Sequence, residues 1–284
     1  MSYKVVPEDH ERYAILTDTT LCTGCETCVQ ACKNTYSLGR DRNWRWKNKI
    51  DDLSSTRFTT IVRRPGSRFV RQQCRHCLEP ACVSACIVGA LQKTPEGPVV
   101  YDSGRCMGCR YCMMACPYGI PRYSWEDAVP LVRKCIMCHD RIVEGGQPAC
   151  TEACPYGATI FGTRAEMIET AVERMAAHPG RYYTAPDHDE PTLYGYDEVG
   201  GVSVLYLSDV SLDFLGWRPN LGTKALPALT WAALSKVPPT VFGVAAGMTA
   251  VYWIIGRRMR LQHERAAAEA AGQTDSQAEA HDGE

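Results

Sequence analysis

The longest apolar stretch of the chain lies near its C-terminus. From Val237 to Gly256 no residue is charged. As a helix this stretch is about 30 Å long, which is the thickness of the hydrocarbon core of a membrane. Trp231 on one side and Tyr252 and Trp253 on the other are residue types that favour the membrane interface. The pattern predicts one transmembrane helix, with a buried helix of a soluble protein as the alternative.

A second periodic segment begins at Thr163. Thr163 and Glu166 have the spacing of a capping box, and Gly180 follows the segment as a stop signal. Apolar residues then recur with helical spacing, so we predict a helix that packs one side on the core. That side consists of Met167, Ile168, Ala171, Val172 and Met175. Residues 181–226 show no regular pattern apart from a strand-like run at 201–207.

The charges beside the apolar stretch predict its orientation. Arg218, Lys224 and Lys236 precede it, whereas Arg257, Arg258, Arg260 and Arg265 follow it. Because cytoplasmic flanks carry an excess of Lys and Arg, we predict a cytoplasmic C-terminus and a head on the other face of the cytoplasmic membrane. Within the stretch, a G-x-x-x-G pattern at 243–247 lets another membrane helix approach closely. Residues 261–284 are rich in Ala, Glu and Gln, which predicts a frayed helix followed by disorder.

The composition is unusual in its number of cysteines. The 284 residues carry a formal net charge of −1 and 45% hydrophobic residues, enough for one or two compact domains plus an appendage. No basic excess points to nucleic acid as a partner. The chain has sixteen cysteines. Its first sixteen residues contain neither an apolar signal core nor a twin arginine, so export is expected only as a folded passenger on a partner's signal. Thiols made in a reducing cytosol serve metal or redox chemistry rather than disulfides.

The cysteines fall into four groups of four with none left over. The first motif is Cys22, Cys25, Cys28 and Cys32; the second is Cys74, Cys77, Cys82 and Cys86; the third is Cys106, Cys109, Cys112 and Cys116; the fourth is Cys135, Cys138, Cys150 and Cys154. The first and third have the spacing C-x2-C-x2-C-x3-C, while the second and fourth stretch the middle gap. The motifs form an internal repeat, in which Ala-Cys-Pro-Tyr-Gly occurs at 115–119 and again at 153–157.

These spacings suit cubane iron–sulfur clusters. Three cysteines at i, i+3 and i+6 wrap three iron corners, and in such two-cluster runs the fourth cysteine ligates the other cluster. Four motifs therefore predict four 4Fe–4S clusters in two interlocked pairs. Four all-cysteine zinc sites are the alternative, but zinc knuckles have no role for the cysteine at i+6 or for the following proline. Ile87 stands where that proline is expected after Cys86, which puts the local geometry there in question.

Several other side chains flank the motifs. His76 and His139 are interpreted as groups that at most tune the cluster potential, or as surface residues. Cations beside an anionic cluster stabilise its reduced state, although a solvated loop charge is an equal alternative; these cations are Arg75, Arg105, Arg110, Arg133 and Lys134. The basic, tryptophan-bearing segment 33–49 is either a docking surface for a larger subunit or a solvated loop. No nucleophile, acid–base pair or Gly-rich phosphate loop stands out, so the chain is expected to conduct electrons and not to transform a substrate.

With its motifs in this order, the chain resembles the four-cluster iron–sulfur subunits of the molybdopterin oxidoreductase family. The likeness also includes Cys-Arg-Tyr-Cys at 109–112, Phe-Gly-Thr at 161–163, Gly-Gly at 200–201 and the single terminal span. It is closest to the membrane-anchored kinds: the beta subunit of respiratory formate dehydrogenase and the ferredoxin-like subunit of quinone-linked nickel–iron hydrogenase. The dimethyl sulfoxide and polysulfide reductase kind usually lacks the span.

The resemblance implies how the motifs pair. Motif one would share its clusters with motif four, and motif two with motif three. The implied ligand sets are Cys22, Cys25, Cys28 with Cys154; Cys135, Cys138, Cys150 with Cys32; Cys74, Cys77, Cys82 with Cys116; and Cys106, Cys109, Cys112 with Cys86. It also implies a linear wire from a large catalytic subunit, of molybdopterin or nickel–iron type, to a membrane cytochrome b or quinone-reactive subunit. The first pair would face the catalytic subunit and the second the membrane.

These inferences predict an α+β fold of two interlocked ferredoxin-like domains and one C-terminal transmembrane helix. The expected divisions are a head at 1–160, an extension at 161–236, the span at 237–256 and a cytoplasmic tail at 257–284. A soluble multi-cluster ferredoxin and a zinc-bound structural adaptor remain alternatives of other classes. The donor that feeds the wire, whether formate, hydrogen or another, lies in a partner chain.

Overall fold

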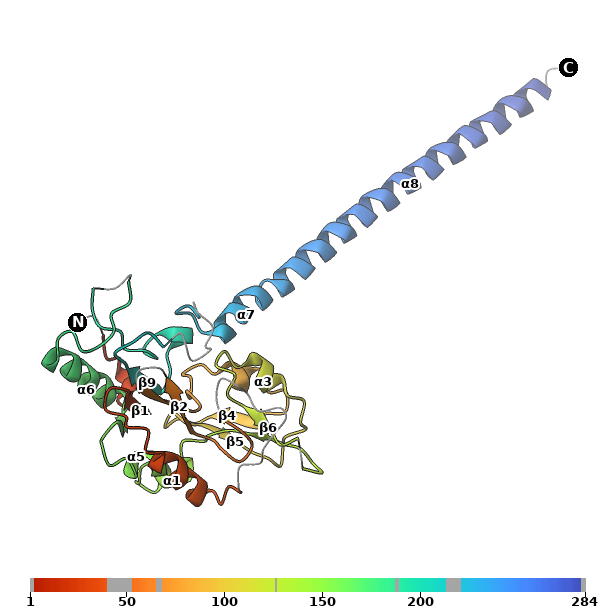
Figure 1. Ribbon diagram of the computed structural model, residues 1–284. Helices are drawn as coiled ribbons and strands as arrows, with labels where there is room; N and C mark the ends of the chain where they lie inside the picture. The colour runs from red at the N-terminus through yellow and green to blue at the C-terminus, as the bar shows by residue number, and fades with distance from the viewer. Residues whose placement is uncertain are drawn as a thin grey trace. The chain divides into compact units, whose positions relative to one another are not determined.

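The computed structural model describes residues 3–39, 53–64, 68–125, 127–186, 189–212 and 221–281 (Figure 1). From residue 40 on, the basic segment 33–49 lies outside these ranges. The chain forms two units, Met1–Leu229 and Thr230–Glu284. The elements up to the last strand are η1 (Pro7–Asp9), β1 (Tyr13–Asp18), α1 (Thr27–Thr35), β2 (Thr60–Arg64), β3 (Arg68–Gln72), α2 (Ala81–Ser84), β4 (Leu91–Lys93), β5 (Val99–Tyr101), α3 (Tyr111–Ala115), β6 (Arg122–Tyr123), β7 (Val132–Arg133), α4 (His139–Val143), α5 (Ala149–Glu152), β8 (Thr159–Thr163), α6 (Arg164–Ala177), η2 (Glu198–Gly200) and β9 (Val204–Leu207). The two that follow are α7 (Leu226–Leu234) and α8 (Val237–His281). The fold is therefore of mixed α+β class.

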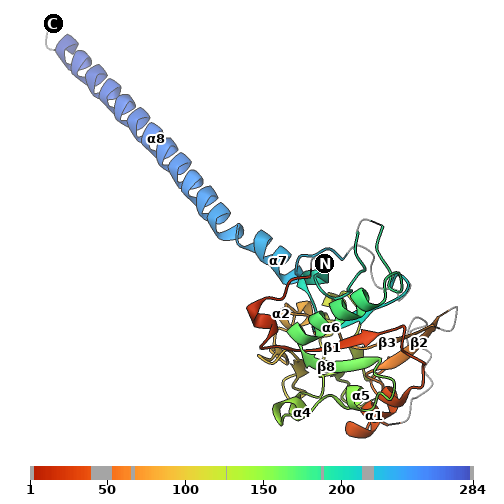
Figure 2. The same cartoon turned by 90° about the vertical axis from the view of Figure 1, so that its left-hand side faces the viewer.

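A three-stranded sheet in the order β8–β1–β9 divides the first unit into two cores. β1 runs antiparallel to β8 and parallel to β9, and Figure 2 shows β1 and β8 side by side with α6 along them. Ala14 and Leu16 of β1 pack with the buried face of α6. Ile15, which points to the opposite face because strand side chains alternate, packs with Cys74 and Met137 of the cysteine loops.

The same sheet joins the expected head and extension. β8 spans the boundary we placed at residue 160, and β9 comes from the extension yet pairs with β1 through Ile15 opposite Val204. Among the described residues, three antiparallel hairpins lie between the cysteine motifs: β2–β3 separates the first two motifs, β4–β5 the next two and β6–β7 the last two.

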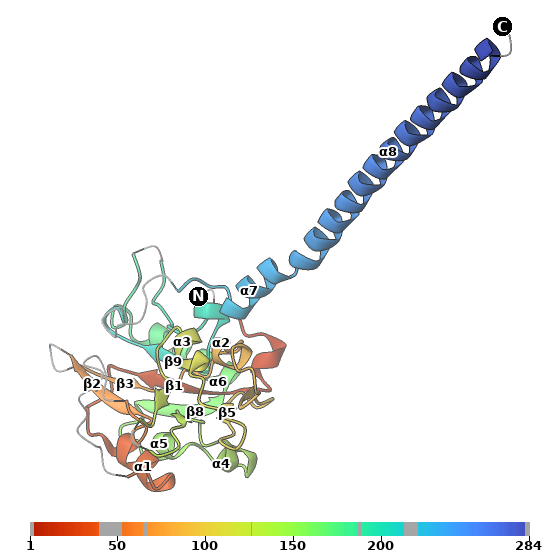
Figure 3. The ribbon, with the colours of Figure 1, turned by 90° about the vertical axis from the view of Figure 1, so that its right-hand side faces the viewer.

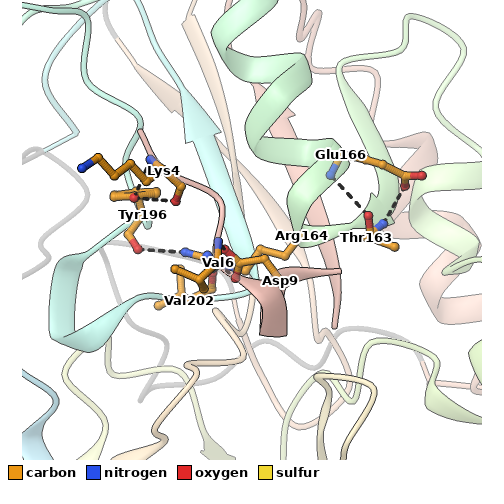
Figure 4. Close-up of polar contacts among 8 residues, drawn as sticks. All are labelled: Lys4, Val6, Asp9, Thr163, Arg164, Glu166, Tyr196 and Val202. Carbon is orange, nitrogen blue, oxygen red and sulfur yellow. Dashed lines mark hydrogen bonds and ion pairs between the residues drawn. The ribbon is translucent and has the colours of Figure 1, made fainter. Parts of the chain in front are cut away.

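The predicted capping box of α6 is present (Figure 4). The Glu166 backbone N–H donates to the Thr163 hydroxyl at 3.2 Å, and the Thr163 N–H donates to the Glu166 carboxylate at 2.8 Å. The helix ends at Ala177, just before Gly180, whose φ of 78° suits glycine. Every apolar residue predicted to face the core is in the α6 cluster. The prediction for this helix is confirmed.

A buried ion pair ties the N-terminal segment to α6. Arg164 donates to the Asp9 carboxylate at 2.6 Å, and both side chains are almost fully buried. The same guanidinium donates to the backbone carbonyls of Tyr196 at 2.8 Å and Val202 at 3.3 Å (Figure 4). Next to Val202, the Leu78 N–H donates to the Gly201 carbonyl at 3.0 Å. Arg164 therefore fixes a loop that in turn supports the second cysteine motif.

Removing one partner of this pair is expected to be costly. Asp9→Ala leaves the Arg164 charge buried without a counter-ion, which we expect to destabilise the fold by about 3–5 kcal/mol. Glu8→Ala, at the exposed neighbouring position, is the matched control and should stay within about 0.5 kcal/mol of the parent protein. Urea unfolding followed by fluorescence measures both. Equal midpoints for the two variants would show that the ion pair contributes nothing.

The second unit is helical. Within the described residues one candidate membrane span is present, Leu226–Ala268, with a mean hydropathy of 1.4 and none of its most apolar window buried. This exposure counts against a core helix of a soluble protein. α8 contains the predicted span and continues to His281, beyond the frayed helix we expected after residue 260. Ala, Glu and Gln have high helix propensity, which explains the continuation.

Candidate metal centre

The four cysteine motifs share one backbone conformation. The residue before the second cysteine has a positive φ in every motif: 75° at Gly24, 50° at His76, 73° at Gly108 and 58° at Met137. For the two non-glycine residues this conformation costs about 1–3 kcal/mol and persists only where the surroundings impose it. At Gly24 a side chain is excluded as well, since an added Cβ would lie 2.4 Å from the Phe69 ring. The repeat found in the sequence is thus a repeat of loop geometry.

The last cysteine of three motifs is followed by a second shared turn. Gly89, Gly119 and Gly157 have φ values of 64°, 59° and 59°. Their N–H groups donate to the carbonyls of the last cysteines at 3.1, 3.1 and 3.5 Å. The turn after Cys86 therefore matches the other two although Ile87 replaces proline. The question raised by Ile87 is answered: the local geometry is retained without the proline.

The helical turns that carry the cysteines pack across motifs. α1, with Cys28 and Cys32, packs against α5, with Cys150, and α2, with Cys82, packs against α3, with Cys112. Figure 3 shows both neighbour pairs. Cys28 and Cys150 share one buried cluster, and Cys82 and Cys112 share another. Motif one thus meets motif four, and motif two meets motif three.

A cavity opens inside the first motif. Its empty space is about 380 Å³, part of it open to solvent, and the thiol-bearing residues that line it are Cys22, Cys25, Cys28 and Cys154. The pKa of Cys28 is raised to about 11, chiefly by burial; Arg71 opposes this rise, and the nearby thiols of Cys150, Cys22 and Cys154 add to it. Burial also raises the pKa of Cys22, and Cys154 is the thiol that acts on it most strongly. Cys154 therefore lies beside the first motif.

The fourth motif receives Cys32 in the same way. Burial raises the pKa of Cys32 to about 12, and the next contributions come from the Cys150 and Cys138 thiolates. Burial raises the pKa of Cys135 well above its usual value, and Cys32 is again the thiol that adds most to it. Tyr36, at the end of α1, hydrogen-bonds Cys138. Cys32 thus lies beside the thiols of the fourth motif.

The second and third motifs are related likewise. Burial raises the pKa of Cys77 well above its usual value, and the next largest contribution comes from the Cys116 thiol. The pKa of Cys112 is raised to about 11, chiefly by burial, and the next largest contribution comes from the Cys86 thiol. All sixteen cysteines lie in the described ranges, and none of them forms a disulfide. The thiols therefore gather in groups that contain cysteines from two motifs.

Hydrogen-bond donors point at the sulfurs. Backbone N–H groups donate to Cys86 from Ala90 at 3.2 Å, to Cys116 from Ile120 at 3.5 Å and to Cys135 from Met137 at 3.3 Å. The Thr27 hydroxyl donates to Cys25 at 3.3 Å. Such bonds stabilise thiolates and are among the factors that set cluster potentials.

The thiol groups fit iron–sulfur clusters. Thiolates are the ligands that such clusters use, and metal binding deprotonates thiols whose pKa burial has raised. Within the described ranges, no three Cys, His, Asp or Glu side chains converge closely enough to hold a single metal ion, so the fit rests on the wider groups described above.

Comparison with known proteins agrees with this chemistry. Residues 66–164 match the family model described as a 4Fe-4S dicluster domain. A protein of Nitratidesulfovibrio vulgaris strain Hildenborough is 41% identical over 97% of this chain and 76% of its own length. The hydrogenase-2 operon protein HybA of Escherichia coli O157:H7 is 37% identical over 78% of this chain and 76% of its own length. The formate dehydrogenase-O iron–sulfur subunit of Escherichia coli K12 is 36% identical over 69% of this chain and 67% of its own length.

The chain belongs to this family of iron–sulfur electron-transfer subunits. It relays electrons in an oxidoreductase complex of several subunits, and iron–sulfur clusters are its cofactors. Bound clusters supply one-electron carriers, and the subunit's own residues hold them, shield them from water and set their potentials.

The two histidines of the subunit have different surroundings. His76 is buried, its Nδ1 accepts the Val99 N–H at 2.9 Å, and burial together with Lys134 and Lys93 lowers its pKa well below the usual value. It is therefore neutral at pH 7. His139 is partly exposed and lies 3.3 Å from the Glu96 carboxylate.

The flanking cations divide into buried and exposed groups. Arg75 and Lys134 are buried: Arg75 lies over the Tyr206 ring at 4.3 Å, and Lys134 donates to the Cys135 carbonyl at 2.9 Å. Arg105 is exposed and pairs with Asp102 at 3.2 Å. Arg110 lies over the Trp125 ring at 5.0 Å, and Arg133 is half-buried in β7. Which of these cations are buried and which are exposed could not be predicted from the sequence.

Sequence reasoning missed a buried cation beside the first and fourth motifs. Arg71, on β3, lines the cavity of the first motif and is 1% exposed. It lies three residues before Cys74 and outside every motif, so motif spacing gave no signal for it. The alternation of β3 is no guide either, since its residues Val70 and Gln72, on the other face, are as buried as Arg71.

Proposed function

We propose that this subunit carries four 4Fe–4S clusters and relays electrons between a catalytic subunit of the formate dehydrogenase or hydrogenase type and a cytochrome b or quinone-reactive subunit in the membrane. The observation that carries the proposal is the contact between motifs: α1 with α5 and α2 with α3. Two two-cluster units that exchange their fourth cysteines require this arrangement. On this basis the chain conducts electrons and does not itself transform a substrate.

The proposed ligand sets follow the exchange. Cys154 completes the first motif and Cys32 the fourth, while Cys116 completes the second and Cys86 the third. The shared cavity supports the first set. The other three ligand sets are supported by cysteines of different motifs that lie near one another: Cys32 near Cys150 and Cys138, Cys116 near Cys77, and Cys86 near Cys112. The head then consists of two interlocked ferredoxin-like domains, and the β8–β1–β9 sheet packs against cysteine loops of both.

The direction of the wire is part of the proposal. Large apolar side chains beside the second and third motifs are exposed, including Ile87 at 68%, Met107 at 63% and Met114 at 82%. Exposed apolar surface of this kind marks a site for a partner. It supports a partner at the second pair; that this partner is the membrane subunit, and that the first pair faces the catalytic subunit, follows the order implied by the family resemblance.

HybA and the formate dehydrogenase-O subunit support the type of partner. HybA, named for hydrogenase-2, aligns with more of this chain than the formate dehydrogenase-O subunit does. This observation is the reason to keep a nickel–iron hydrogenase as a second candidate partner beside the molybdopterin enzyme. The metal of the largest co-purifying subunit distinguishes them, since nickel indicates a hydrogenase and molybdenum or tungsten a molybdopterin enzyme.

The cluster count is tested by chemical analysis. We expect about sixteen irons and about sixteen acid-labile sulfides per chain in anaerobically purified protein, because each of the four clusters holds about four of each. Reduced samples should show interacting paramagnetic resonance signals. Stoichiometric zinc with little iron would instead support the structural adaptor and reject the proposal.

A further inference from the structure

A buried arginine lies where the first and fourth motifs meet. Arg71 pairs across the hairpin with Ile61 of β2, and Ile61 packs against Cys28 and Cys150. Arg71 also lines the cavity that contains the thiols of Cys22, Cys25, Cys28 and Cys154. The β2–β3 hairpin thus places a cation inside the cluster site.

The guanidinium of Arg71 lacks the partners that a buried charge requires. Its Nε, Nη1 and Nη2 atoms are all buried, and none has a hydrogen-bond partner among the described residues. Its backbone carbonyl accepts the Tyr206 hydroxyl at 2.8 Å, so only the side chain is unsatisfied. By contrast the buried Arg75 donates to Gln72 at 2.7 Å. Since unpaired buried charges are strongly disfavoured, a partner for Arg71 is expected in the cavity.

Thiolates from both motifs surround this cation. Burial lowers the pKa of Arg71, but the Cys150 and Cys28 thiolates reverse that effect and, with Tyr206 and Cys135, raise it. In the ligand sets proposed above, Cys28 belongs to one cluster of the first pair, and Cys150 and Cys135 belong to the other. Arg71 therefore lies between the two sets.

We propose that Arg71 is a cation shared by both clusters of the first pair, to whose sulfurs its guanidinium donates charge-assisted hydrogen bonds that raise both reduction potentials. The inference rests on the proposed ligand sets. A guanidinium has five N–H donors in a planar fork, so one side chain reaches sulfurs on two sides. Reduction adds one electron to a cluster, while Arg71 keeps its proton in both redox states. Its fixed positive charge therefore favours the reduced form of each cluster.

Redox titration of the purified complex, followed by paramagnetic resonance, tests this role. Arg71→Gln removes the charge and most donors, and Arg71→Lys keeps the charge without the fork. Arg63→Gln is the matched control, because Arg63 lies on β2 of the same hairpin but is exposed and stacks on Phe69 at 5.4 Å. The two signals are first assigned as those lost in Cys22→Ser and in Cys138→Ser.

We expect Arg71→Gln to lower the reduction equilibrium constant of both clusters about tenfold or more, which is about 59 mV each for one electron. Arg71→Lys should give a smaller shift of the same sign, and Arg63→Gln none. Full iron with unchanged potentials in Arg71→Gln, or a shift in one cluster alone, would overturn the inference. If Arg71→Gln loses iron, the potentials of Arg71→Lys decide instead: unchanged potentials, or a shift in one cluster alone, would overturn the inference. A parent protein without iron would refute the proposed function instead.

Discussion

Cys154→Ser should abolish the cluster held by Cys22, Cys25 and Cys28 and leave the cluster of its own motif neighbours in place. The physical reason is the open corner left by a loop with cysteines at i, i+3 and i+6. Cys154 lines the same cavity as those three residues. We expect the variant to lose roughly a quarter of its iron, because one of four clusters is lost. Electron transfer through the complex should fall with it, since a linear wire has no bypass.

Comparison among single variants identifies the lost cluster. Cys154→Ser and Cys22→Ser should remove the same paramagnetic resonance signal, whereas Cys138→Ser should remove a different one. Cys116→Ser is the equivalent change in the other pair and should leave both of these signals intact. A Cys154→Ser spectrum that lacks the Cys138→Ser signal would contradict the exchange of fourth cysteines.

The elements predicted from sequence are those whose signals are local. The α6 capping box lies within four residues of chain, and its apolar side repeats with helical period, so its start and its buried face were both predictable. The same holds for the charge-free stretch inside α8. The cysteine loops were found from spacing alone, because every motif keeps a C-x2-C start and a C-x3-C end whatever the length of its middle gap.

What the sequence did not reveal depends on distant contacts. β1 is buried on both faces, by α6 on one side and by the cysteine loops on the other, so Tyr13–Asp18 shows no apolar–polar alternation. Its pairing with β9 joins residues nearly two hundred positions apart, which is why the expected boundary at residue 160 divides one sheet. Arg71 was missed for a related reason: a charged residue outside any motif reads as solvated until the fold places it in a cavity.

The prediction with the largest effect at the level of the cell concerns the side of the membrane on which the head lies. We expect protease added to intact spheroplasts to digest the head and to spare an epitope attached to the C-terminus. The reason is the excess of arginine after the apolar stretch, at Arg257, Arg258 and Arg260, because cytoplasmic flanks retain positive charge. Because the clusters are built in the cytosol, the head must then cross the membrane already folded.

Two controls make this result decisive. A cytoplasmic protein must survive the protease, which shows that the spheroplasts are closed, and lysed cells must lose both head and epitope. Replacing the three arginines by glutamine tests the cause, because a head that depends on their charge for orientation should become partly protected. Protection of the head in intact spheroplasts, with cleavage only after lysis, would place the head and its catalytic partner in the cytoplasm. The arginines would then anchor the helix end at a surface without deciding its direction.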